Sequence, residues 1–216
     1  MWVIPKITLE FIERMLDILE VLKRPYDLHF PVVCMDEKSK QLLQETRQFL
    51  GMSPGKPKRI DYEYKRNGTV NIFVAVEPKG GKRIARVTSH RKKWDYAFFI
   101  KFLVDYIYPH AITIVLIEDN LNTHTKKSLI DTFGETEGNR LADKIEWHFT
   151  PKHASWLDPA EIEIHSLETI CLNKRIGTFH DMTIEVAAYV KERNQYKCGI
   201  NWQFTREKAI EKFHLN

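Results

Sequence analysis

The stretch that most constrains this chain is residues 112–120, an apolar run that ends in acids. Its β-favouring residues are interrupted only by Thr113, and they predict a buried strand over 112–117. The run ends at Glu118 and Asp119, where the backbone leaves the core. Carboxylates at the tip of a buried strand are oxygen ligands that suit a divalent cation. An aspartate at this point is also an ordinary turn former, so the stretch needs support from other segments.

Two further segments place acids next to apolar runs. Residues 31–36 (PVVCMD) form a short β-branched run that ends in Asp36. Residues 158–161 (DPAE) are typical of a helix start, with Asp158 as N-cap and proline at the first helical position. Glu161 then falls in the first turn of the helix. There it either bonds back to its own helix terminus, as in a capping box, or faces a metal site, and the local sequence leaves both open.

The composition of the 216 residues is that of an ordinary globular protein, with 43% hydrophobic and 29% charged residues, and it suffices for one sizeable α/β domain. No apolar run approaches membrane-span length and the N-terminus lacks a signal-peptide pattern, so we expect a cytoplasmic protein without a membrane partner. Cys34, Cys171 and Cys198 form no CxxC pair and are expected to be reduced thiols. No recognised spacing links His148, His153 and Cys171, which argues against zinc.

The remaining elements are read from periodicity and turn residues. The predicted helices cover 8–22 (capped by Thr8), 94–108, one segment within 125–144, 162–172, 180–191 and 206–213. The predicted strands at 70–76 and 84–87 form a hairpin, a further strand covers 145–149, and 51–59 is an exposed loop. This order predicts an α/β fold: a mixed sheet of an antiparallel hairpin plus parallel strands, flanked by helices.

Residues 79–93 carry seven Lys or Arg and no acid. A solvated surface is the ordinary explanation of a charge run, but a run without one compensating acid is better explained by a polyanion. The formal net charge of +4 is too small to carry a nucleic-acid assignment by itself. The residues expected to contact DNA from this run are Lys82, Arg83, Arg86, Arg91, Lys92 and Lys93.

The order of elements, with acids on a first strand, a later strand and a late helix, resembles the RNase H-like nucleases. Three segments resemble the acidic blocks of DDE transposases of bacterial insertion sequences, in the branch related to mariner: PVVCMDEKSKQL (31–42), LIEDNLNTH (116–124) and HFTPKHASWLDPAEIE (148–163). Three more resemble connecting parts of that family: RPYD, YKRNGTVNIF and CLNKRI. The likeness covers nearly the whole chain, and the last two acidic blocks are its specific part.

The resemblance implies a transposase catalytic domain over 31–195, after a connecting helix in 1–30 and before a C-terminal tail helix in 196–216. It makes Asp36, Asp119 and Glu161 the catalytic ligands of two Mg²⁺ ions, replaceable by Mn²⁺. Such ions lie about 4 Å apart, where one activates the attacking hydroxyl and the other stabilises the leaving oxygen. Enzymes of this family cut DNA with water and then join the freed 3′ hydroxyl to a target strand.

Several neighbours of these acids have open roles. Lys152 and His153 match the family block and are expected to touch DNA, whereas Trp156 is at least as much a candidate for the core. His124 either contacts phosphate or a metal-bound water, or serves as a capping or hydrogen-bonding residue. Strand alternation points Glu37 and Glu118 to the face opposite the proposed ligands, which argues against direct metal ligation.

Two departures from the family affect these expectations. Family members usually carry Asn where this chain has Asp158; both residues cap helices, but the added charge can raise the pKa of Glu161 or alter cation affinity. Such transposases usually begin with helix-turn-helix modules, whereas this chain starts near the catalytic domain. That leaves open a fragment, one product of a split reading frame, or a decayed copy, with a separate N-terminal module as partner.

Three functions remain in view. The first is a metal-dependent DNA transposase that acts as a homodimer or larger assembly on transposon ends and target DNA, associated with a bacterial nucleoid. The second is a non-catalytic DNA-binding remnant of a transposase. The third is another RNase H-like nuclease, such as a junction resolvase.

Overall fold

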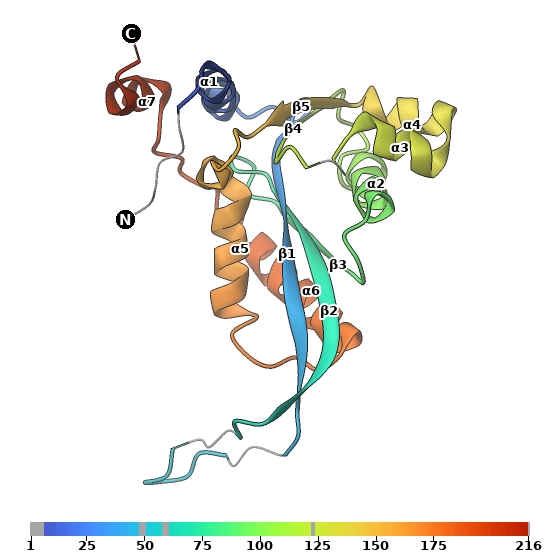
Figure 1. The fold of residues 1–216 in the computed structure, drawn as a ribbon, viewed down its shortest axis with the longest axis vertical. Helices are drawn as coiled ribbons and strands as arrows, with labels where there is room; N and C mark the ends of the chain where they lie inside the picture. The colour runs from blue at the N-terminus through green and yellow to red at the C-terminus, as the bar shows by residue number, and fades with distance from the viewer. Residues whose placement is uncertain (1–6, 48–50, 58–60, 122–123, 216) are drawn as a thin grey trace.

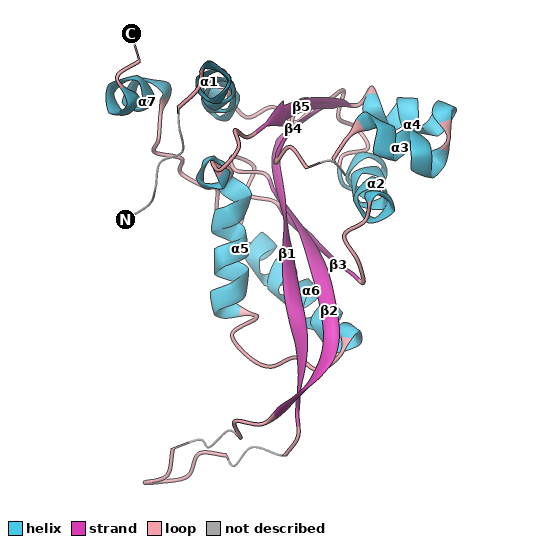
Figure 2. Ribbon diagram, viewed as in Figure 1, coloured by secondary structure: helices cyan, strands magenta, loops and turns pink. Residues whose placement is uncertain are grey.

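The computed structural model describes residues 7–47, 51–57, 61–121 and 124–215. Its centre is a five-stranded sheet with the strand order β3-β2-β1-β4-β5 (Figures 1 and 2). The strands are β1 Val32–Glu45, β2 Tyr64–Val76, β3 Arg83–Thr88, β4 Ile114–Glu118 and β5 Ile145–Phe149. β2 is antiparallel to both β1 and β3, while β1, β4 and β5 run parallel. The predicted mixed sheet, with its hairpin and parallel strands, is confirmed.

Helices cover both faces of the sheet (Figure 1). They are α1 Leu9–Lys23, α2 Lys93–Phe102 with a π-helical continuation Leu103–Ile107, α3 Lys126–Phe133, α4 Glu135–Ala142, α5 Pro159–Ile170, α6 Phe179–Tyr196 and α7 Arg206–Phe213. Val33 and Met35 of β1 pack into a core with α2, α3 and α4. Cys34 packs on the other face, beneath α1, α5 and α7. α6 joins that face through a third cluster, in which it packs with α5 on β1, β2 and β3.

β1 is longer than its sequence predicts. The predicted strand ends at Asp36, whereas the observed strand continues to Glu45 and pairs with β2 along that length. From Glu37 onward the chain is polar, so its extended form comes from pairing with β2 rather than from its own β-propensity. Beyond the helices the two strands continue as a narrow ribbon (Figure 2). Asp36 therefore lies inside a strand and not at its end.

Other elements agree with the sequence or differ in detail. The Thr8 hydroxyl caps α1 by accepting the Phe11 amide at 3.1 Å, and strand 145–149 and helix 206–213 match their predicted bounds. Residues 125–144 hold two helices instead of one, because Gly134, with φ of 83°, ends α3 and begins α4. Residues 51–57 form the expected exposed loop, and the end of that loop, 58–59, falls outside the described residues.

The termini pack on the sheet as well. α7 contacts α1 through the edge-to-face rings of Phe11 and Phe213, whose centroids are 6.3 Å apart. The Ile200 amide donates to the Pro78 carbonyl at 2.7 Å. Cys34, Cys171 and Cys198 are free thiols. Within the described parts of the chain, no helix has the length and apolar character needed to cross a membrane.

Candidate active site

Parallel pairing of β1 with β4 brings two predicted ligands level with each other. Cys34 is the register partner of Ile117. Asp36 and Asp119 each lie two residues further along, but alternation of side chains fixes the face of Asp36 alone, because only Asp36 is inside its strand. Asp36 lies within β1, and Asp119 follows directly on the last residue of β4. α5 covers this face, and its first turn supplies Glu161.

The carboxylates lie close enough for their charges to act on one another. Burial raises the pKa of Asp36 to about 7, against the hydrogen bond that its Oδ1 accepts from the Glu37 amide at 2.7 Å. The negative charges of Asp119, Glu37 and Glu161 add to this rise in pKa. Burial also holds the pKa of Asp158 well above its usual range, with further increases from Asp36, Glu161 and Asp119. Asp119 and Glu161 thus lie close enough to Asp36 to affect its ionisation, and the role of these three residues as metal ligands stays a prediction.

The helix start at Asp158 decides between the two readings of Glu161. Oδ1 of Asp158 accepts the Ala160 amide at 2.8 Å, so Asp158 is the predicted N-cap. A capping box would require Glu161 to accept the Asp158 amide. That amide instead donates to the carbonyl of Ser155 at 2.8 Å. Glu161 therefore does not form the capping box, and its role as a metal ligand stays a prediction.

His124 is buried among the acids, with none of its side chain exposed. Nε2 donates to Oε1 of Glu37 at 2.9 Å, and Nδ1 lies 2.8 Å from Oδ1 of Asp119. Burial favours the neutral ring, but the bonds to Asp119 and Glu37 and the charge of Glu118 raise its pKa to about 11. The imidazolium thus bridges β1 to the end of β4. Its burial does not fit the expected contact with DNA phosphate, and it matches the hydrogen-bonding role.

Glu37 and Glu118 lie on the α2 side of the sheet, as strand alternation predicts. The Tyr96 hydroxyl of α2 donates to Oε1 of Glu118 at 3.0 Å, and the Tyr96 ring stacks on His124 with centroids 4.6 Å apart. Burial raises the pKa of Glu118 to about 8, although His124 and Tyr96 oppose this. Tyr96 had no signal in the sequence beyond its place in an apolar helix.

The acids at this end of the sheet form a cluster of carboxyl groups. Its members are Asp36, Glu37, Glu118, Asp119, Asp158 and Glu161. Within the described ranges, every ion pair of these carboxylates goes to His124. Mg²⁺ and Mn²⁺ take carboxylate oxygens, so this donor set fits a divalent cation.

The most compact set of possible ligand atoms differs from the predicted one. One atom each of Glu37, Asp119 and His124 lie within 4.8 Å of one another. Both ring nitrogens of His124 carry protons when the ring is an imidazolium, and they then offer no lone pair to a metal. His124 contacts Asp119 directly, and the assignment of Asp36, Asp119 and Glu161 as the ligands stays a prediction.

Most residues of the basic run are exposed. Lys82, Arg86, Arg91, Lys92 and Lys93 lie on the surface of β3, its preceding turn and the start of α2. Some of these cations already have neighbours: Lys93 pairs with Asp131 at 2.9 Å, and Arg86 lies 5.1 Å from the centroid of the Phe102 ring. These exposed side chains can still reach a DNA backbone.

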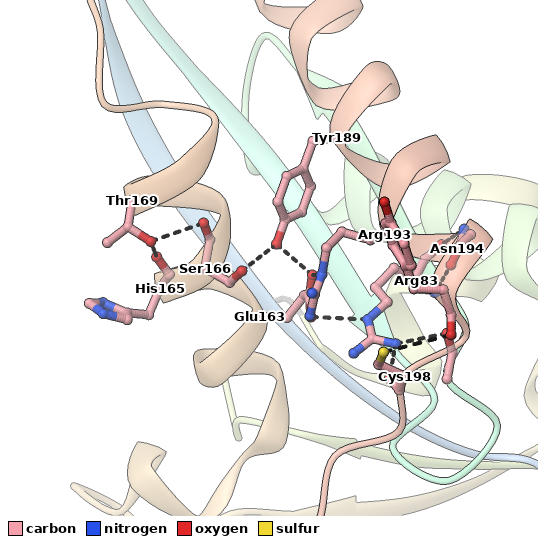
Figure 3. Close-up of polar contacts among 11 residues, drawn as sticks. Arg83, Glu163, His165, Ser166, Thr169, Tyr189, Arg193, Asn194 and Cys198 are labelled. Atoms are coloured by element: carbon pink, nitrogen blue, oxygen red, sulfur yellow. Dashed lines mark hydrogen bonds and ion pairs between the residues drawn. The ribbon is translucent and has the colours of Figure 1, made fainter.

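Arg83 differs from its neighbours because its side chain is only 2% exposed. It points into the protein and pairs with Glu163 of α5 at 3.0 Å (Figure 3). The expectation that Arg83 contacts DNA is therefore contradicted by its burial. A count of charges along a sequence does not distinguish a surface cation from one whose partner lies on a distant helix.

The loop before α5 carries the remaining candidates. Lys152 and His153 are exposed beside the N-terminus of α1, where they line a cavity of about 210 Å³. Trp156 is partly exposed and packs edge-to-face on Phe204, with centroids 5.3 Å apart. Lys152 and His153 are thus free to meet a ligand, and Trp156 combines packing with exposure.

Comparison with known families gives one match, to the DDE superfamily endonucleases, over residues 31–183. That span covers more than half of the chain and all three candidate ligands. The chain belongs to the DDE superfamily endonucleases. No curated protein matches the sequence.

Solved structures similar to this DDE endonuclease are complexes of the Mos1 mariner transposase. The paired-end complex with Mn matches with a TM-score of 0.57 and 18% identity, covering 91% of this chain and 60% of that chain. The strand transfer complex matches with a TM-score of 0.57 and 18% identity, covering 88% and 57%. This likeness establishes the RNase H-like fold of the DDE endonuclease. The chain spans about 60% of the transposase chains it matches.

Sequence reasoning also missed Glu163, which is buried in this DDE endonuclease. The helical periodicity of the sequence indicated that Glu163 is buried. Ala160, Ile164 and Leu167 form the buried stripe of α5, and Glu163 occupies a position on that stripe. A charged residue on an apolar stripe indicates a buried partner, but the sequence does not say that the partner is Arg83.

Proposed function

We propose that this chain is the catalytic domain of a DNA transposase, which cleaves DNA and joins 3′ ends to a target with divalent cations. The observation that carries the proposal is the proximity of Asp119 and Glu161 to Asp36, whose pKa their charges raise. Two parallel strands bring the aspartates level with each other, and α5 adds the glutamate. The family match and the transposase fold support the same activity.

The chemistry follows from phosphodiester displacement. In cleavage, the oxygen of water bonds to phosphorus as the bond to O3′ breaks, which leaves a 3′ hydroxyl and a 5′ phosphate. In transfer, that 3′ hydroxyl bonds to a target phosphorus while one target strand leaves, so the number of phosphodiester bonds is conserved. Two Mg²⁺ or Mn²⁺ ions, held by the three acids, would supply charge neutralisation at phosphorus and at both oxygens.

The other residues of the site have supporting roles. His124 keeps the Asp119 carboxylate at the end of β4, and Tyr96 holds the His124 ring from its stacked face. Exposed cations of the basic run, with Lys152 and His153, contact the DNA backbone. These contacts carry charge but no base readout, so they position DNA without selecting its sequence. Selection of transposon ends falls to a separate helix-turn-helix module.

Assembly and location belong to the same proposal. Cleavage and joining of two transposon ends require two active sites, so we expect a homodimer or a larger assembly on paired ends. The substrate places the enzyme with bacterial DNA, in the cytoplasm and at the nucleoid.

The first test compares nicking of supercoiled plasmid at low salt with Mn²⁺ by wild type and by Asp119→Asn. Low salt is needed because binding depends on phosphate contacts. Asp143→Asn is the matched control, because Asp143 is exposed and pairs with the surface residue Lys126 at 3.7 Å. Wild type and the control nick the plasmid, and Asp119→Asn does not.

Other outcomes decide between the alternatives. DNA binding without nicking by wild type favours the non-catalytic remnant and removes the enzyme assignment. Equal nicking by wild type and Asp119→Asn places the activity at other residues or in a contaminant. Nicking without any joining of 3′ ends to a second DNA favours a nuclease of the resolvase kind.

A further inference from the structure

A buried carboxylate connects α5 to two other elements, β3 and α6 (Figure 3). Arg83 of β3 donates from Nε to Oε2 of Glu163 at 3.0 Å, and both side chains are 2% exposed. From α6, the Tyr189 hydroxyl donates to Oε1 at 2.6 Å, and Arg193 donates to both oxygens at 3.3 Å. Glu163 therefore joins β3, α5 and α6 through a single side chain.

Arg83 is itself held in place by several groups. Its guanidinium donates to the carbonyl of Gly81 at 2.8 Å and to the carbonyl of Cys198. Its backbone exchanges two hydrogen bonds with the Asn194 side chain, at 2.7 and 2.8 Å. β3 is an edge strand, and Asn194 takes the place that a neighbouring strand would have. Arg83, the ion-pair partner of Glu163, is thus held in one position.

Helix geometry relates this anchor to the candidate site. Glu161 and Glu163 are two residues apart, and at 3.6 residues per turn they point in directions about 200° apart around the helix. Glu161, in the first turn of α5, lies close enough to Asp36 for its negative charge to raise the pKa of that carboxyl. Glu163 faces β3 and α6. Fixing Glu163 therefore sets the rotation of α5 about its axis, and with it the direction of Glu161.

Stability alone does not account for an ion pair at this position. Ala160, Ile164 and Leu167 already bury the inner face of α5. A buried ion pair usually contributes no more stability than apolar residues of similar volume, because burial of the charges is costly. Apolar packing tolerates small rotations of a helix, whereas several hydrogen bonds to one carboxylate define one orientation. The hydrogen bonds to Glu163 therefore fix the orientation of α5.

We propose that Glu163 is a positioning residue, which holds Glu161 toward Asp36 and Asp119 and so preserves divalent-cation binding. The proposal rests on the proposed function, because it requires these acids to bind the cation. Residues that orient metal ligands typically change metal affinity or activity by about 10- to 100-fold when altered. We expect a change of that size when the Glu163 charge is removed.

The test replaces Glu163 with Gln and measures Mn²⁺ binding directly. The electron paramagnetic resonance signal of free Mn²⁺, followed during titration without DNA, gives the affinity for each variant. Glu168→Gln is the matched control on the same helix, since Glu168 makes partly exposed pairs with Lys38 at 3.0 Å and with Lys40 at 3.9 Å. Glu163→Gln is expected to weaken Mn²⁺ binding at least 10-fold and to lower nicking per folded molecule, while Glu168→Gln stays within about 2-fold.

The double variant Glu163→Gln/Arg83→Met separates an effect on the orientation of α5 from an effect on folding stability. Glu163→Gln alone leaves the Arg83 guanidinium buried without its main partner, so its melting temperature falls. Adding Arg83→Met removes that buried charge and raises the melting temperature toward wild type. Mn²⁺ affinity and nicking stay low in the double variant if Glu163 orients α5. Recovery of Mn²⁺ affinity together with the melting temperature would show a purely structural pair and overturn the proposal.

The Asp119→Asn variant distinguishes failure of the proposed metal site from failure of the proposed positioning role. If wild type binds Mn²⁺ no better than Asp119→Asn does, the acids are not a metal site, and both proposals are overturned. If Mn²⁺ binding depends on Asp119 but is unchanged in Glu163→Gln, the metal site stands and the positioning role alone is overturned. Mn²⁺ binding that depends on both residues supports both.

Discussion

Nδ1 of His124 lies 2.8 Å from Oδ1 of Asp119, while Nε2 of the same ring donates to Glu37 at 2.9 Å. The two carboxylates come from β1 and from the end of β4. One buried cation therefore connects the two strands on which the predicted aspartates lie.

Replacing His124 with Ala should destabilise the fold and impair nicking. The substitution leaves the buried carboxylates of Glu37 and Glu118 without their cation, and loss of one partner of a buried ion pair costs about 3–5 kcal/mol. Urea unfolding measures the loss. His90→Ala, at an exposed position, should stay within about 0.5 kcal/mol. A loss for His124→Ala as small as that of His90→Ala would mean that the ion pairs do not stabilise the fold.

The contribution of Glu163 to stability should depend on pH. Burial opposes its ionisation, but hydrogen bonds from Tyr189, Arg193 and Arg83 hold its pKa below the ordinary 4.5. A carboxyl with a lowered folded pKa stabilises the fold above its unfolded pKa, and this contribution is lost as pH falls through the folded pKa. The difference in unfolding free energy between wild type and Glu163→Gln should therefore be full at neutral pH and shrink below pH 4.5. A difference that stays constant down to pH 3 would contradict this assignment.

Arg83 and Arg86 should behave differently in DNA binding, although both lie on β3. Arg86→Ala removes an exposed cation, so binding should weaken for all sequences and the slope of log K against log salt should fall by about 0.9. Arg83→Met should lower thermal stability and leave that slope unchanged, because its guanidinium pairs with Glu163. Filter binding over a range of salt concentrations measures both slopes. Equal loss of slope in the two variants would place Arg83 at the DNA surface.

Gly138 should not tolerate a side chain, since a Cβ there would lie 2.6 Å from Cα of Ile130 where α4 crosses α3. Gly138→Ala is expected to lower the unfolding free energy by about 1–3 kcal/mol through overpacking. Gly51→Ala is the control, because a Cβ at that position meets no atom within 4 Å. Equal stability of the two variants would show that α3 and α4 separate at little cost.

Local rules predicted the elements whose structure depends on local sequence. Thr8 and Asp158 cap their helices as expected, and the alternation of side chains on β1 places Glu37 away from Asp36. The acids were found because each follows an apolar run or begins a helix, and because the blocks that carry them resemble those of DDE transposases. These features depend on the chain within a few residues of each position.

Features that depend on distant partners were not accessible in the same way. The second half of β1 is extended because β2 pairs with it, and nothing in its own composition indicates a strand. Arg83 was counted with the DNA-binding cations because Glu163 lies 80 residues away. The role of His124 was left open between a phosphate contact and a hydrogen-bonding role, because the sequence does not show that two strands and α2 enclose it. In each case the partner comes from another element, and only the fold identifies it.

The position of Asp36 inside a continuous strand has a consequence for local unfolding. Its backbone belongs to a ladder with Val74, in the middle of the sheet, whereas Asp119 follows the last residue of β4. Amides in such a central ladder exchange with solvent only when most of the protein opens, while those beyond a strand end exchange by smaller fluctuations. Asp36 and Asp119 therefore belong to parts of the chain that unfold with different cooperativity. The backbone at Asp36 should therefore open only when the whole fold unfolds, whereas the backbone at Asp119 should open when the contacts of His124 are lost.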